Sequence, residues 1–473
     1  MRRKLTSLLV ITAIGLSFIG MGLVWSQNAR AEATAANLSP TDVLTMVMSY
    51  IRTNSLKDVS VADLVEGALK GMVDSLGDPH SEYIAAKDYQ AASEDISGTF
   101  GGIGVNIELR DGYVTVVSPI PGTPAERAGI LPGDQIVEVD GKNVVGQTLE
   151  EVAKLVRGQP GTSVTIGIKR PPRPETIPFA IVRALIEVNP VDVKYFADDT
   201  VGYIALSQFN AHTTQHLQVA LQAFGIKNVH KVILDLRGNP GGYLNEALSV
   251  ASSFLPPNTP LVRLVGREGE EVPNSQRVPY NALGDQVIVL VDKGSASASE
   301  IVAGALQDYA AAILVGERTY GKGTVQNITG LPTGGGIRLT VAEYFSPLGK
   351  KIDGTGITPD VPVPSYDLAA AQEAVHQMNA GRKLARGDVG LDVLGLQNLL
   401  RVLGFAEKDP DGVFGPSTAT AVVAFQKAAG LKATGLMDED TYAKLNLAAR
   451  SPESAGLPDR QLDKALQILT EAH

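Results

Sequence analysis

Four short apolar runs in the middle of the chain have the continuous hydrophobic pattern of strands that are buried on both faces. The runs begin near Val201, Val232, Val287 and Ile313. Helical stretches separate them, and strands that alternate with helices are typical of a parallel sheet built from crossover units. Residues 184–364 are therefore predicted to form an α/β core.

Glycine-rich turns follow two of these runs, where each strand would end. The run 232–236 leads into Arg237-Gly-Asn-Pro-Gly-Gly242, and the run 287–291 leads through Gly294 into a helix. Glycine lets the backbone approach a ligand closely, and the N-terminus of a helix carries a partial positive charge. A strand, a tight turn and a helix together can hold a nucleophile in an exposed position.

Residues 96–183 have a different pattern, with short strands and two short helices. Phe100-Gly-Gly-Ile-Gly104 leads into a segment, 105–109, in which apolar residues alternate at period two. Thr123-Pro-Ala-Glu126 and Thr148-Leu-Glu-Glu151 both have the spacing of a capping box. We therefore expect a helix to begin at each threonine.

The flanking regions are predicted to be helical. Residues 32–95 form an N-terminal arm in which apolar side chains recur at helical spacing. Beyond an Ala-rich linker at 365–385, residues 386–448 form a small domain with two apolar helix faces. A last helix within 449–473 is expected to return and pack on the core or on the arm.

Residues 1–31 have the three parts of an export signal. Three basic residues, 2–4, precede an uncharged apolar stretch at 8–25, and Ala29-Arg-Ala31 offers a cleavage site. The stretch is near the lower length limit for crossing a bilayer, so a cleaved signal and a retained anchor both stay open. In either case we expect the rest of the chain in the periplasm or the extracytoplasmic envelope, with membrane contact only through this segment.

Composition limits the partners. The chain has 473 residues, a net charge of −10 and no cysteine. The negative charge argues against a nucleic-acid partner, because phosphate binding needs a basic surface, and the lack of cysteine excludes disulfides and thiolate chemistry. Only His212 and His216 are spaced to share a helix face, and without an H-E-x-x-H pattern we expect neither a metal site nor an organic cofactor.

Ser297 begins the helix after the run 287–291 and is the candidate nucleophile. Ser297-Ala-Ser-Glu300 also fits a capping box, in which the two side chains only satisfy free amides of the helix. The strand, turn and helix around it favour the nucleophile. A serine hydroxyl becomes nucleophilic when a positioned base takes its proton, and a neutral lysine amine can be that base.

Lys322 is the candidate base, although its surroundings allow a second interpretation. Residues 316–322 nearly spell a phosphate-binding loop, but Gly323 stands where that loop needs Ser or Thr, and no helix is predicted after it. A lysine base must be neutral near pH 7, so its pKa must fall from about 10.4 to about 7, roughly 4 kcal/mol of bias against the charged form. Burial without a carboxylate partner has this effect.

Acyl transfer also needs donors for the developing oxyanion, usually backbone amides. Gly241 or Gly242, together with Ala298 beside the serine, are the candidates, and an ordinary glycine turn is the alternative. Gln326, four residues after Lys322, can orient the amine through a hydrogen bond or be an ordinary strand residue.

Four blocks of sequence together resemble the carboxy-terminal processing proteases, Ser/Lys endopeptidases of the bacterial and chloroplast envelope. The blocks are DLRGNPGG, GSASASE, GERTYGKGTVQ and LTVAEYFSPLGKKIDGTGITPDVPV. The resemblance implies a crotonase-like core with Ser297 as nucleophile, Lys322 as general base and Gln326 as the residue that orients the lysine. Ser295 and Ser299 are the alternatives if the register of the motif is shifted.

Residues 96–183 resemble a PDZ domain, whose exposed strand edge pairs with an extended peptide while a glycine-rich loop binds the C-terminal carboxylate. In the resembled family an arginine of this domain couples ligand occupancy to the active site, and Arg157 is the candidate; a cation that complements the helix dipole is its alternative. A core aromatic and a tight turn are the alternatives for the loop residues. The expected peptide-binding loop is Phe100, Gly101, Gly102, Ile103 and Gly104.

Residues 386–448 contain the blocks DVLGLQNLL, DGVFGPSTATAVVAFQKAAGL and TGLMDEDTYAKL. With these blocks they resemble the small helical peptidoglycan-binding domain, and a helical spacer or a dimer contact is the alternative. The chain is thus predicted to be a multidomain α/β protein with a protease core, an inserted PDZ domain, an N-terminal helical arm and a small helical C-terminal domain. We expect a serine endopeptidase that cleaves exported proteins near apolar C-termini, with peptidoglycan as a candidate partner and, by resemblance, a homodimer formed through the arm. A non-catalytic envelope scaffold and a nucleotide-dependent enzyme are the alternatives.

Overall fold

The computed structural model describes residues 39–171, 173, 175–378 and 381–471. The chain forms two compact units, one of Met1–Ala86 with Ile328–Leu339 and the other of Lys87–Asn327 with Thr340–His473. The expected export signal at 1–31 lies outside the described residues. Among the helices that are described, none is long and apolar enough to cross a membrane.

The first unit contains two helices and a short strand of the predicted arm. The elements are α2 (Pro40–Asn54), α3 (Val61–Asp74) and β1 (Glu82–Ile84). Both helices begin with a complete capping box, and β1 pairs antiparallel with the first residues of β18 (Gly336–Phe345). On α2 the apolar side chains Met46 and Val47 are exposed.

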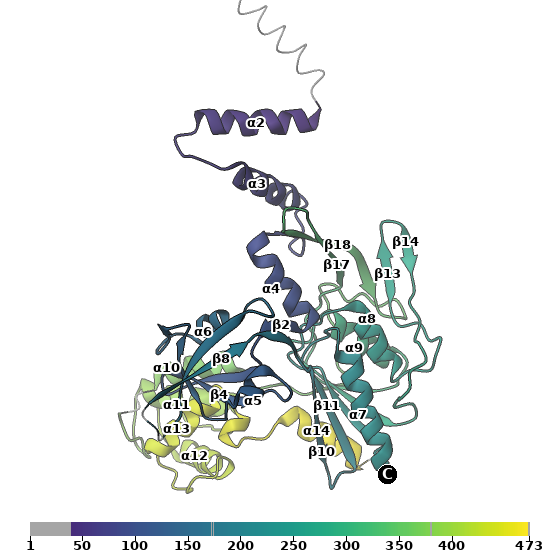
Figure 1. The fold of residues 1–473 in the computed structure, drawn as a ribbon. Coiled ribbons are helices and arrows are strands. Elements are labelled where there is room, and N and C mark those ends of the chain that lie inside the picture. Colours follow the sequence, from purple (N-terminus) through teal and green to yellow (C-terminus); the bar gives the residue numbers. More distant parts are fainter. Residues whose placement is uncertain (1–38, 172, 174, 379–380, 472–473) are drawn as a thin grey trace, which may run out of the picture. The chain divides into compact units, whose positions relative to one another are not determined.

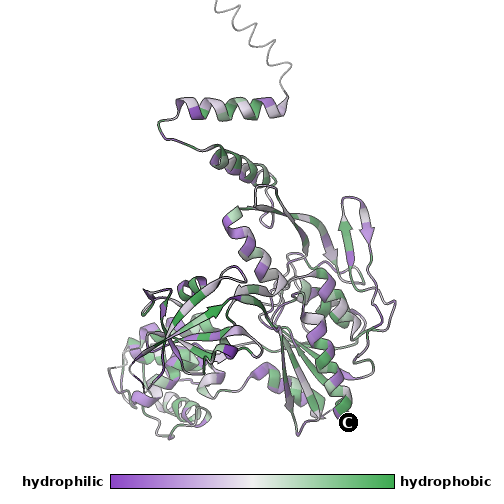
Figure 2. Ribbon diagram, viewed as in Figure 1, coloured by the Kyte–Doolittle hydropathy of each residue, from purple (hydrophilic) through white to green (hydrophobic). Residues whose placement is uncertain are grey.

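The second unit is built around a six-stranded sheet (Figure 1) in the order β10-β11-β12-β15-β16-β19. The strands are β10 (Val191–Phe196), β11 (Val201–Leu206), β12 (Lys231–Asp235), β15 (Gln286–Val291), β16 (Ile313–Gly316) and β19 (Val361–Pro362). β10 is antiparallel to β11, and all other neighbours are parallel. The four apolar runs therefore form adjacent parallel strands, as predicted, and Figure 2 shows hydrophobic residues concentrated in this sheet.

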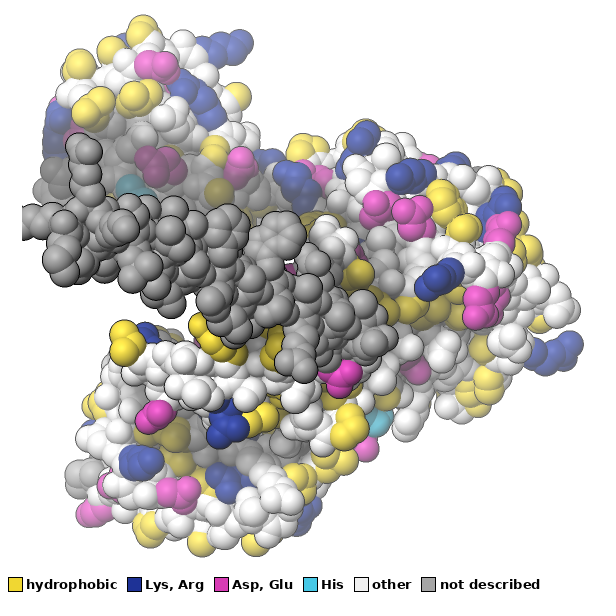
Figure 3. Space-filling view, turned by 90° about the horizontal axis from the view of Figure 1, so that it is seen from above, with side chains coloured by type: hydrophobic (Ala, Val, Ile, Leu, Met, Phe, Trp, Pro, Cys, Tyr) yellow, Lys and Arg dark blue, Asp and Glu magenta, His cyan; other side chains and the backbone are white. Residues whose placement is uncertain are grey.

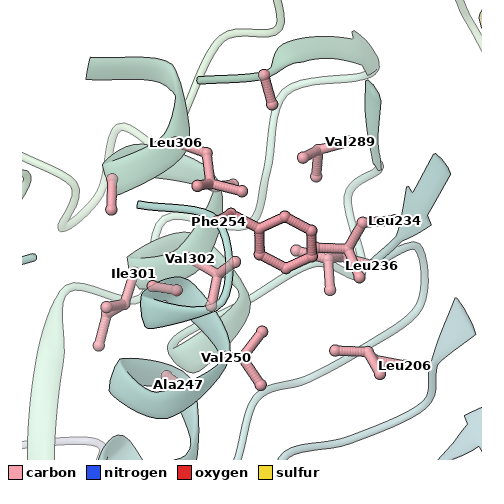
Figure 4. Packing of buried hydrophobic residues seen from close by; sticks show 14 of the residues in the cluster. Leu206, Leu234, Leu236, Ala247, Val250, Phe254, Val289, Ile301, Val302 and Leu306 are labelled. Atoms are coloured by element: carbon pink, nitrogen blue, oxygen red, sulfur yellow. The ribbon is translucent and has the colours of Figure 1, made fainter. Parts of the chain in front are cut away.

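Three helices cover one face of this sheet. They are α7 (Thr213–Lys227), α8 (Leu244–Ser252) and α9 (Ala298–Asp308). Leu234 of the sheet and Val302 of α9 belong to one buried cluster, and Figure 4 shows Phe254 lying among the side chains of that cluster. The packing fixes α9, and with it the turn that begins the helix, against the ends of β12 and β15.

A C-terminal helix covers the opposite face. Ile233 and Leu234 are neighbours on β12, so their side chains point to opposite faces of the sheet. Ile233 packs with Ala465 and Leu469 of α14 (Arg460–Glu471). The prediction that the last helix returns to pack on the core is thus confirmed. Strands buried on both faces explain why the four runs are continuously apolar rather than alternating.

A smaller sheet extends from this core and carries the loop of the candidate base. Its strands are β13 (Arg263–Gly266), β14 (Gly269–Glu271), β17 (Thr324–Gly330), β18 and the short β1. Lys322 lies in the loop that connects β16 to β17. Since β17 and not a helix follows the loop, the geometry of a phosphate-binding loop is not formed.

The PDZ region contains the predicted short strands and two short helices. After α4 (Ala86–Ser97), they are β2 (Thr99–Gly102), β3 (Val105–Arg110), β4 (Tyr113–Pro119), α5 (Pro124–Ala128), β5 (Gln135–Val139), β6 (Lys142–Asn143), α6 (Leu149–Val156), β7 (Ser163–Lys169), β8 (Thr176–Val182) and β9 (Ala184–Glu187). The capping box of Thr148 with Glu151 is confirmed. That of Thr123 was wrong, because its hydroxyl donates to the carbonyls of Gly104 and Ile120 instead.

The C-terminal region is helical, but its boundary differs from the prediction. Its elements are α10 (Leu368–Gln377), α11 (Leu391–Val402), α12 (Pro416–Ala428), α13 (Glu439–Ala448) and a short 3-10 helix at Glu453–Ala455. The stretch 365–385 was predicted as a linker, yet Ala371 and Ala374 of α10 are buried in the core of this helical domain. Small alanine side chains let α10 pack closely there, so α10 belongs to the domain.

Charges are mixed on the surface. Figure 3 shows acidic and basic side chains interspersed over the face that it presents. The whole chain has a net charge of −10. On the face that Figure 3 shows, the described acidic side chains do not form one continuous patch.

Candidate active site

The turn after β15 places three serines at the start of α9. Ser295 and Ser299 are fully buried, and their hydroxyls donate to the carbonyls of Leu236 at 2.8 Å and Asn239 at 2.9 Å. Ser297 lies between them and is only partly buried. Of the three serines, Ser297 is therefore the one that an external substrate can reach.

Ser297 has a strained backbone. Its φ of 55° lies in the left-handed region, although the residue is not glycine, and its ψ of −113° is not that of an ordinary helix cap. Strain of this kind is concentrated at functional sites in proteins. The N–H of Ser297 donates to Glu300 at 2.9 Å, so this contact of the capping-box pattern is present beside the unusual backbone geometry.

Glu300 ties the serine turn to the lysine loop. Its Oε2 accepts the N–H groups of Ser297 and Lys322, each at 2.9 Å. Its Oε1 accepts the N–H of Gly321 at 2.7 Å and the hydroxyl of Thr319 at 2.5 Å. Four donors around one fully buried carboxylate hold both loops in a single geometry.

Two opposing effects act on the protonation of this carboxylate. Burial raises the pKa of Glu300 above its usual value, and the hydrogen bonds from Thr319, Gly321, Ser297 and Lys322 work against that shift. Each of the four is a donor, so each favours the ionised form. The group is thus a buried acceptor that the surrounding donors stabilise.

Tyr344 of β18 makes a second link between the same two residues. Its hydroxyl lies 3.0 Å from the carbonyl oxygen of Ser297 and also contacts the carbonyl oxygen of Lys322. Burial, with the nearby charge of Glu300 as a further cause, raises the pKa of Tyr344 well above its usual value. The hydroxyl is therefore a permanent donor to the backbone of the site.

The glycine turn after β12 lies directly against the serine. A Cβ on Gly241 would come within 2.8 Å of the Ser297 Cβ and 2.9 Å of the Ala298 nitrogen. A Cβ on Gly242 would meet the carbonyl oxygen of Phe209 at 2.2 Å. With φ of 103° and 144°, both positions need glycine.

Asn239 organises this turn. Its side chain donates to the carbonyl of Leu206 at 2.7 Å and accepts the N–H of Gly241 at 2.9 Å. Its own carbonyl accepts the N–H of Ala296 at 3.0 Å. In this conformation the Gly241 amide is thus occupied, which leaves Gly242 and Ala298 as the nearer candidates for donors to a substrate.

The structure brings the other predicted residues into the same region with differing contacts. Lys322 is partly buried, and its backbone is fixed by Glu300 and Tyr344. The side-chain amide of Gln326 donates to Thr324 at 2.8 Å. The orienting role of Gln326 toward Lys322 stays a prediction.

In the PDZ region the segment predicted as the peptide-binding loop is mostly a strand, because Phe100, Gly101 and Gly102 lie in β2 and pair with β9. The predicted arginine lies beside it. The guanidinium of Arg157 stands over the Phe100 ring, 4.6 Å from its centroid. The next residue, Gly158, donates its N–H to the carbonyl of Gly101 at 3.0 Å. The end of α6 therefore contacts β2 at Phe100 and Gly101.

The predicted histidine pair is at the start of α7. The nearest acidic group to His212 is Glu187, 3.9 Å away, and burial, together with the charge of His212, lowers the pKa of His216. In the ranges that the structure describes, no group of three or more His, Cys, Asp or Glu side chains could hold a metal ion.

Sequence reasoning missed three residues that shape the site. Glu300 was noticed only as a helix cap, and neither Asn239 nor Tyr344 was singled out, although each lies inside one of the blocks that carried the resemblance. A buried acid or a tyrosine acting on backbone groups has no signature in the sequence. The only available signal was their position within those blocks.

Comparisons with known proteins were made for the whole chain. The model of peptidase family S41 matches residues 200–363, the PDZ domain model matches 115–170, and the peptidoglycan binding domain model matches 389–445. The model of the activating protease CtpB N-terminal domain matches 10–88. Carboxy-terminal processing protease CtpA of Bacillus subtilis is 33% identical over 98% of both chains.

The chain belongs to the carboxy-terminal processing protease family. A second relative, carboxy-terminal processing protease CtpB of Bacillus subtilis, is 32% identical over 93% of this chain and 91% of that protein. Among solved structures, the photosystem II D1 C-terminal processing protease is 29% identical over 67% of this chain and 86% of its own, with a TM-score of 0.41. The family models and the two Bacillus subtilis relatives confirm the predicted family. Together with the observed helices and sheets, they confirm the predicted fold class, a protease core with a PDZ domain and a helical C-terminal domain.

Proposed function

We propose that this family member is a serine endopeptidase in which Ser297 is the nucleophile and Lys322 the general base. The observation that carries the proposal is the pair of shared contacts through which Glu300 and Tyr344 hold the backbones of Ser297 and Lys322 together. It is supported by the burial of Ser295 and Ser299, which leaves Ser297 as the accessible hydroxyl at a helix N-terminus.

The reaction needs no group beyond the chain and water. Ser297 Oγ attacks the substrate carbonyl carbon while its proton passes to the Nζ of Lys322. The protonated Lys322 then gives that proton to the leaving amine, and the acyl group remains on Ser297 as an ester. A water deprotonated by Lys322 hydrolyses the ester, and the proton returns to the Ser297 oxygen.

The oxyanion donors would be the backbone amides beside the nucleophile. Ala298 is the first residue of α9 and shares in the positive end of that helix. Gly242, from the turn that touches Ser297, supplies the second donor. Gly241 can replace Gly242 only after the Gly241 N–H breaks its hydrogen bond to the side chain of Asn239. Removing one such donor typically costs a factor of 10² to 10³ in kcat.

Substrate selection would lie in the PDZ domain. In the described part of its sheet, β3 is an end strand with β4 as its one neighbour, so an extended peptide can add to the other edge of β3. Ile107 of β3 and Leu155 of α6 are apolar and only partly buried beside that edge. These side chains favour an apolar C-terminal segment, with its carboxylate on the loop Phe100–Gly104 and with Arg157 relaying occupancy.

Location and assembly complete the proposal. The peptidoglycan-binding domain and the family favour an extracytoplasmic location in the periplasm or envelope. Peptidoglycan would be the ligand of the C-terminal domain. The apolar side chains exposed on α2 would form a homodimer contact.

The dyad is tested by cleavage of an unfolded substrate with an apolar C-terminus. Ser297→Ala and Lys322→Ala should both abolish cleavage, while Lys293→Ala, which changes an exposed lysine near the site, should not. The pH profile from 6 to 9 should rise as Lys322 loses its proton. Cleavage by either dyad variant at the wild-type rate would refute the assignment. A lack of cleavage by the wild type itself would favour a non-catalytic scaffold.

The identity of the serine can be read directly. A serine-reactive fluorophosphonate should label the chain, and peptide mapping should find the label on Ser297. A label on Ser295 or Ser299 would show that the register of the motif had been assigned wrongly.

A further inference from the structure

The segment that follows the peptidoglycan-binding domain reaches the catalytic domain before α14 begins. Asp459 is the residue directly before α14, and Ala465 and Leu469 farther along that helix are buried against the sheet. The peptidoglycan-binding domain is therefore inserted between β19 and α14, and the chain returns to the protease through Asp459.

Asp459 makes an ion pair with Arg237. Two parallel hydrogen bonds join them, from Nη1 to Oδ1 at 2.8 Å and from Nη2 to Oδ2 at 2.7 Å. The side chains of Arg237 and Asp459 are each only 20% exposed. A bidentate arginine–carboxylate pair with little solvent around it fixes both partners in position.

Arg237 also binds a carboxylate of the sheet. Its Nε lies 3.0 Å from both carboxylate oxygens of Asp235, and its Nη2 donates to Asp235 at 2.6 Å. Asp235 accepts the hydroxyl of Tyr203 at 2.7 Å and the backbone N–H of Arg237 at 2.9 Å. The guanidinium therefore lies between one acid at the end of β12 and one acid from the C-terminal segment.

The position of Arg237 in the chain gives this pair its significance. Arg237 is the first residue of the turn that ends in Gly241 and Gly242, beside Ser297. The next residue, Gly238, donates to Asp292 in the turn of the nucleophile at 2.9 Å. Arg237 is therefore only a few residues from Gly241 and Gly242, whose turn carries the proposed oxyanion donors.

We propose that Asp459, which follows the peptidoglycan-binding domain in the chain, is a positioning residue. It acts through Arg237 to hold the turn 237–242, which carries the proposed oxyanion donors. The proposal rests on the proposed Ser297 mechanism. It makes the C-terminal segment part of the catalytic apparatus, so that the protease domain is complete only when the chain has returned from its inserted domain.

Loss of Asp459 leaves Arg237 attached to Asp235 and, through a longer hydrogen bond of 3.3 Å, to the side chain of Gln461. The first residue of the turn 237–242 then loses its bidentate ion pair, while the contacts of Gly238 and Asn239, the PDZ domain and the hydrophobic packing of α14 are retained. Misplacement of a catalytic group by about 1 Å can cost about a hundredfold in rate. We therefore expect kcat to fall about tenfold to a hundredfold and KM to change by less than about twofold.

The experiment compares three full-length variants with the wild type. Asp459→Asn removes the charge, Asp459→Glu keeps it, and Asp463→Asn removes an exposed acid from the first turn of the same helix. Steady-state kinetics are measured at a temperature where circular dichroism shows every variant fully folded. The result expected is a lower kcat for Asp459→Asn, partial recovery in Asp459→Glu and unchanged kinetics in Asp463→Asn.

The outcomes separate the two claims. If Asp459→Asn and the wild type have the same kcat while Ser297→Ala is inactive, the positioning role is refuted and the dyad stands. If Ser297→Ala remains active, the mechanism on which this inference rests has failed. A lower melting temperature with an unchanged kcat would show that the ion pair serves stability alone and would also overturn the proposal.

Discussion

The backbone amides of Ser297 and Lys322 donate to the same atom, Oε2 of Glu300, at 2.9 Å each. These two residues are 25 positions apart in the sequence, and the proposed mechanism requires their side chains to meet. Because both backbone amides share one acceptor, the two backbones are held close together whatever their own side chains do. The geometry of the proposed dyad is thus built into the backbone before substrate binds.

Glu300→Gln should damage both activity and folding. The side-chain amide of the glutamine keeps one acceptor oxygen, but its NH2 group faces N–H donors. At least one buried N–H is therefore left unpaired, which lowers the free energy of unfolding by about 1–3 kcal/mol. We expect kcat to fall at least about tenfold, because the two loops lose their common link. Urea unfolding and steady-state kinetics measure these effects, with Glu317→Gln, outside the link, as the control.

Tyr344→Phe removes only the hydroxyl that contacts the carbonyls of Ser297 and Lys322. The ring is 1% exposed and should stay packed, so we expect a loss of about 1 kcal/mol in stability. The rate should fall less than in Glu300→Gln, because the amide link remains. A kcat equal to that of the wild type would show that the tyrosine does not help to position the dyad.

Gly241→Ala should abolish cleavage while leaving the PDZ domain intact. The new methyl group would lie 2.8 Å from the Ser297 Cβ, on a backbone with φ of 103°. Both the clash and the strained conformation displace the turn beside the nucleophile. Peptide binding, measured by fluorescence anisotropy with an apolar C-terminal peptide, should match the wild type; a loss of binding would mean that the change had disturbed the whole fold.

The strands of the core could be predicted from the sequence because burial on both faces leaves a continuous apolar run, as in 287–291. The serine and lysine could be named because they lie in distinctive glycine-rich blocks. Glu300 could not be recognised as a link, since its partners Gly321 and Lys322 meet it only through the fold. The same limit applies to Asp459, which lies 222 positions from Arg237.

Two predictions, the capping box of Thr123 and the linker at 365–385, rested on local sequence patterns that are compatible with more than one structure. Thr123 has the spacing of a capping residue, but the carbonyl of Gly104 lies close enough to take its hydroxyl. An alanine-rich stretch at 365–385 resembles a linker in composition, although small side chains also suit a closely packed helix. In both cases tertiary contacts decided the structure.

The ion pair between Arg237 and Asp459 also predicts how the stability of the fold depends on pH. Burial pushes the pKa of Asp459 upward, but its hydrogen bonds and charge interaction with Arg237 are stronger, so that the pKa is lowered overall. A carboxyl group whose folded pKa is depressed stabilises the fold above its unfolded pKa, about 3.9. That contribution is lost as the pH falls through the lower, folded value.

Asp459→Asn should therefore be less stable than the wild type at pH 7, and the difference should shrink as the pH is lowered from about 5 toward 3. Urea midpoints measured across this range test the prediction, since the arginine stays protonated throughout. Asp463→Asn, at an exposed position on the same helix, should follow the wild-type curve. A constant difference between Asp459→Asn and the wild type at all pH values would show that the lost contact is not an ionic one.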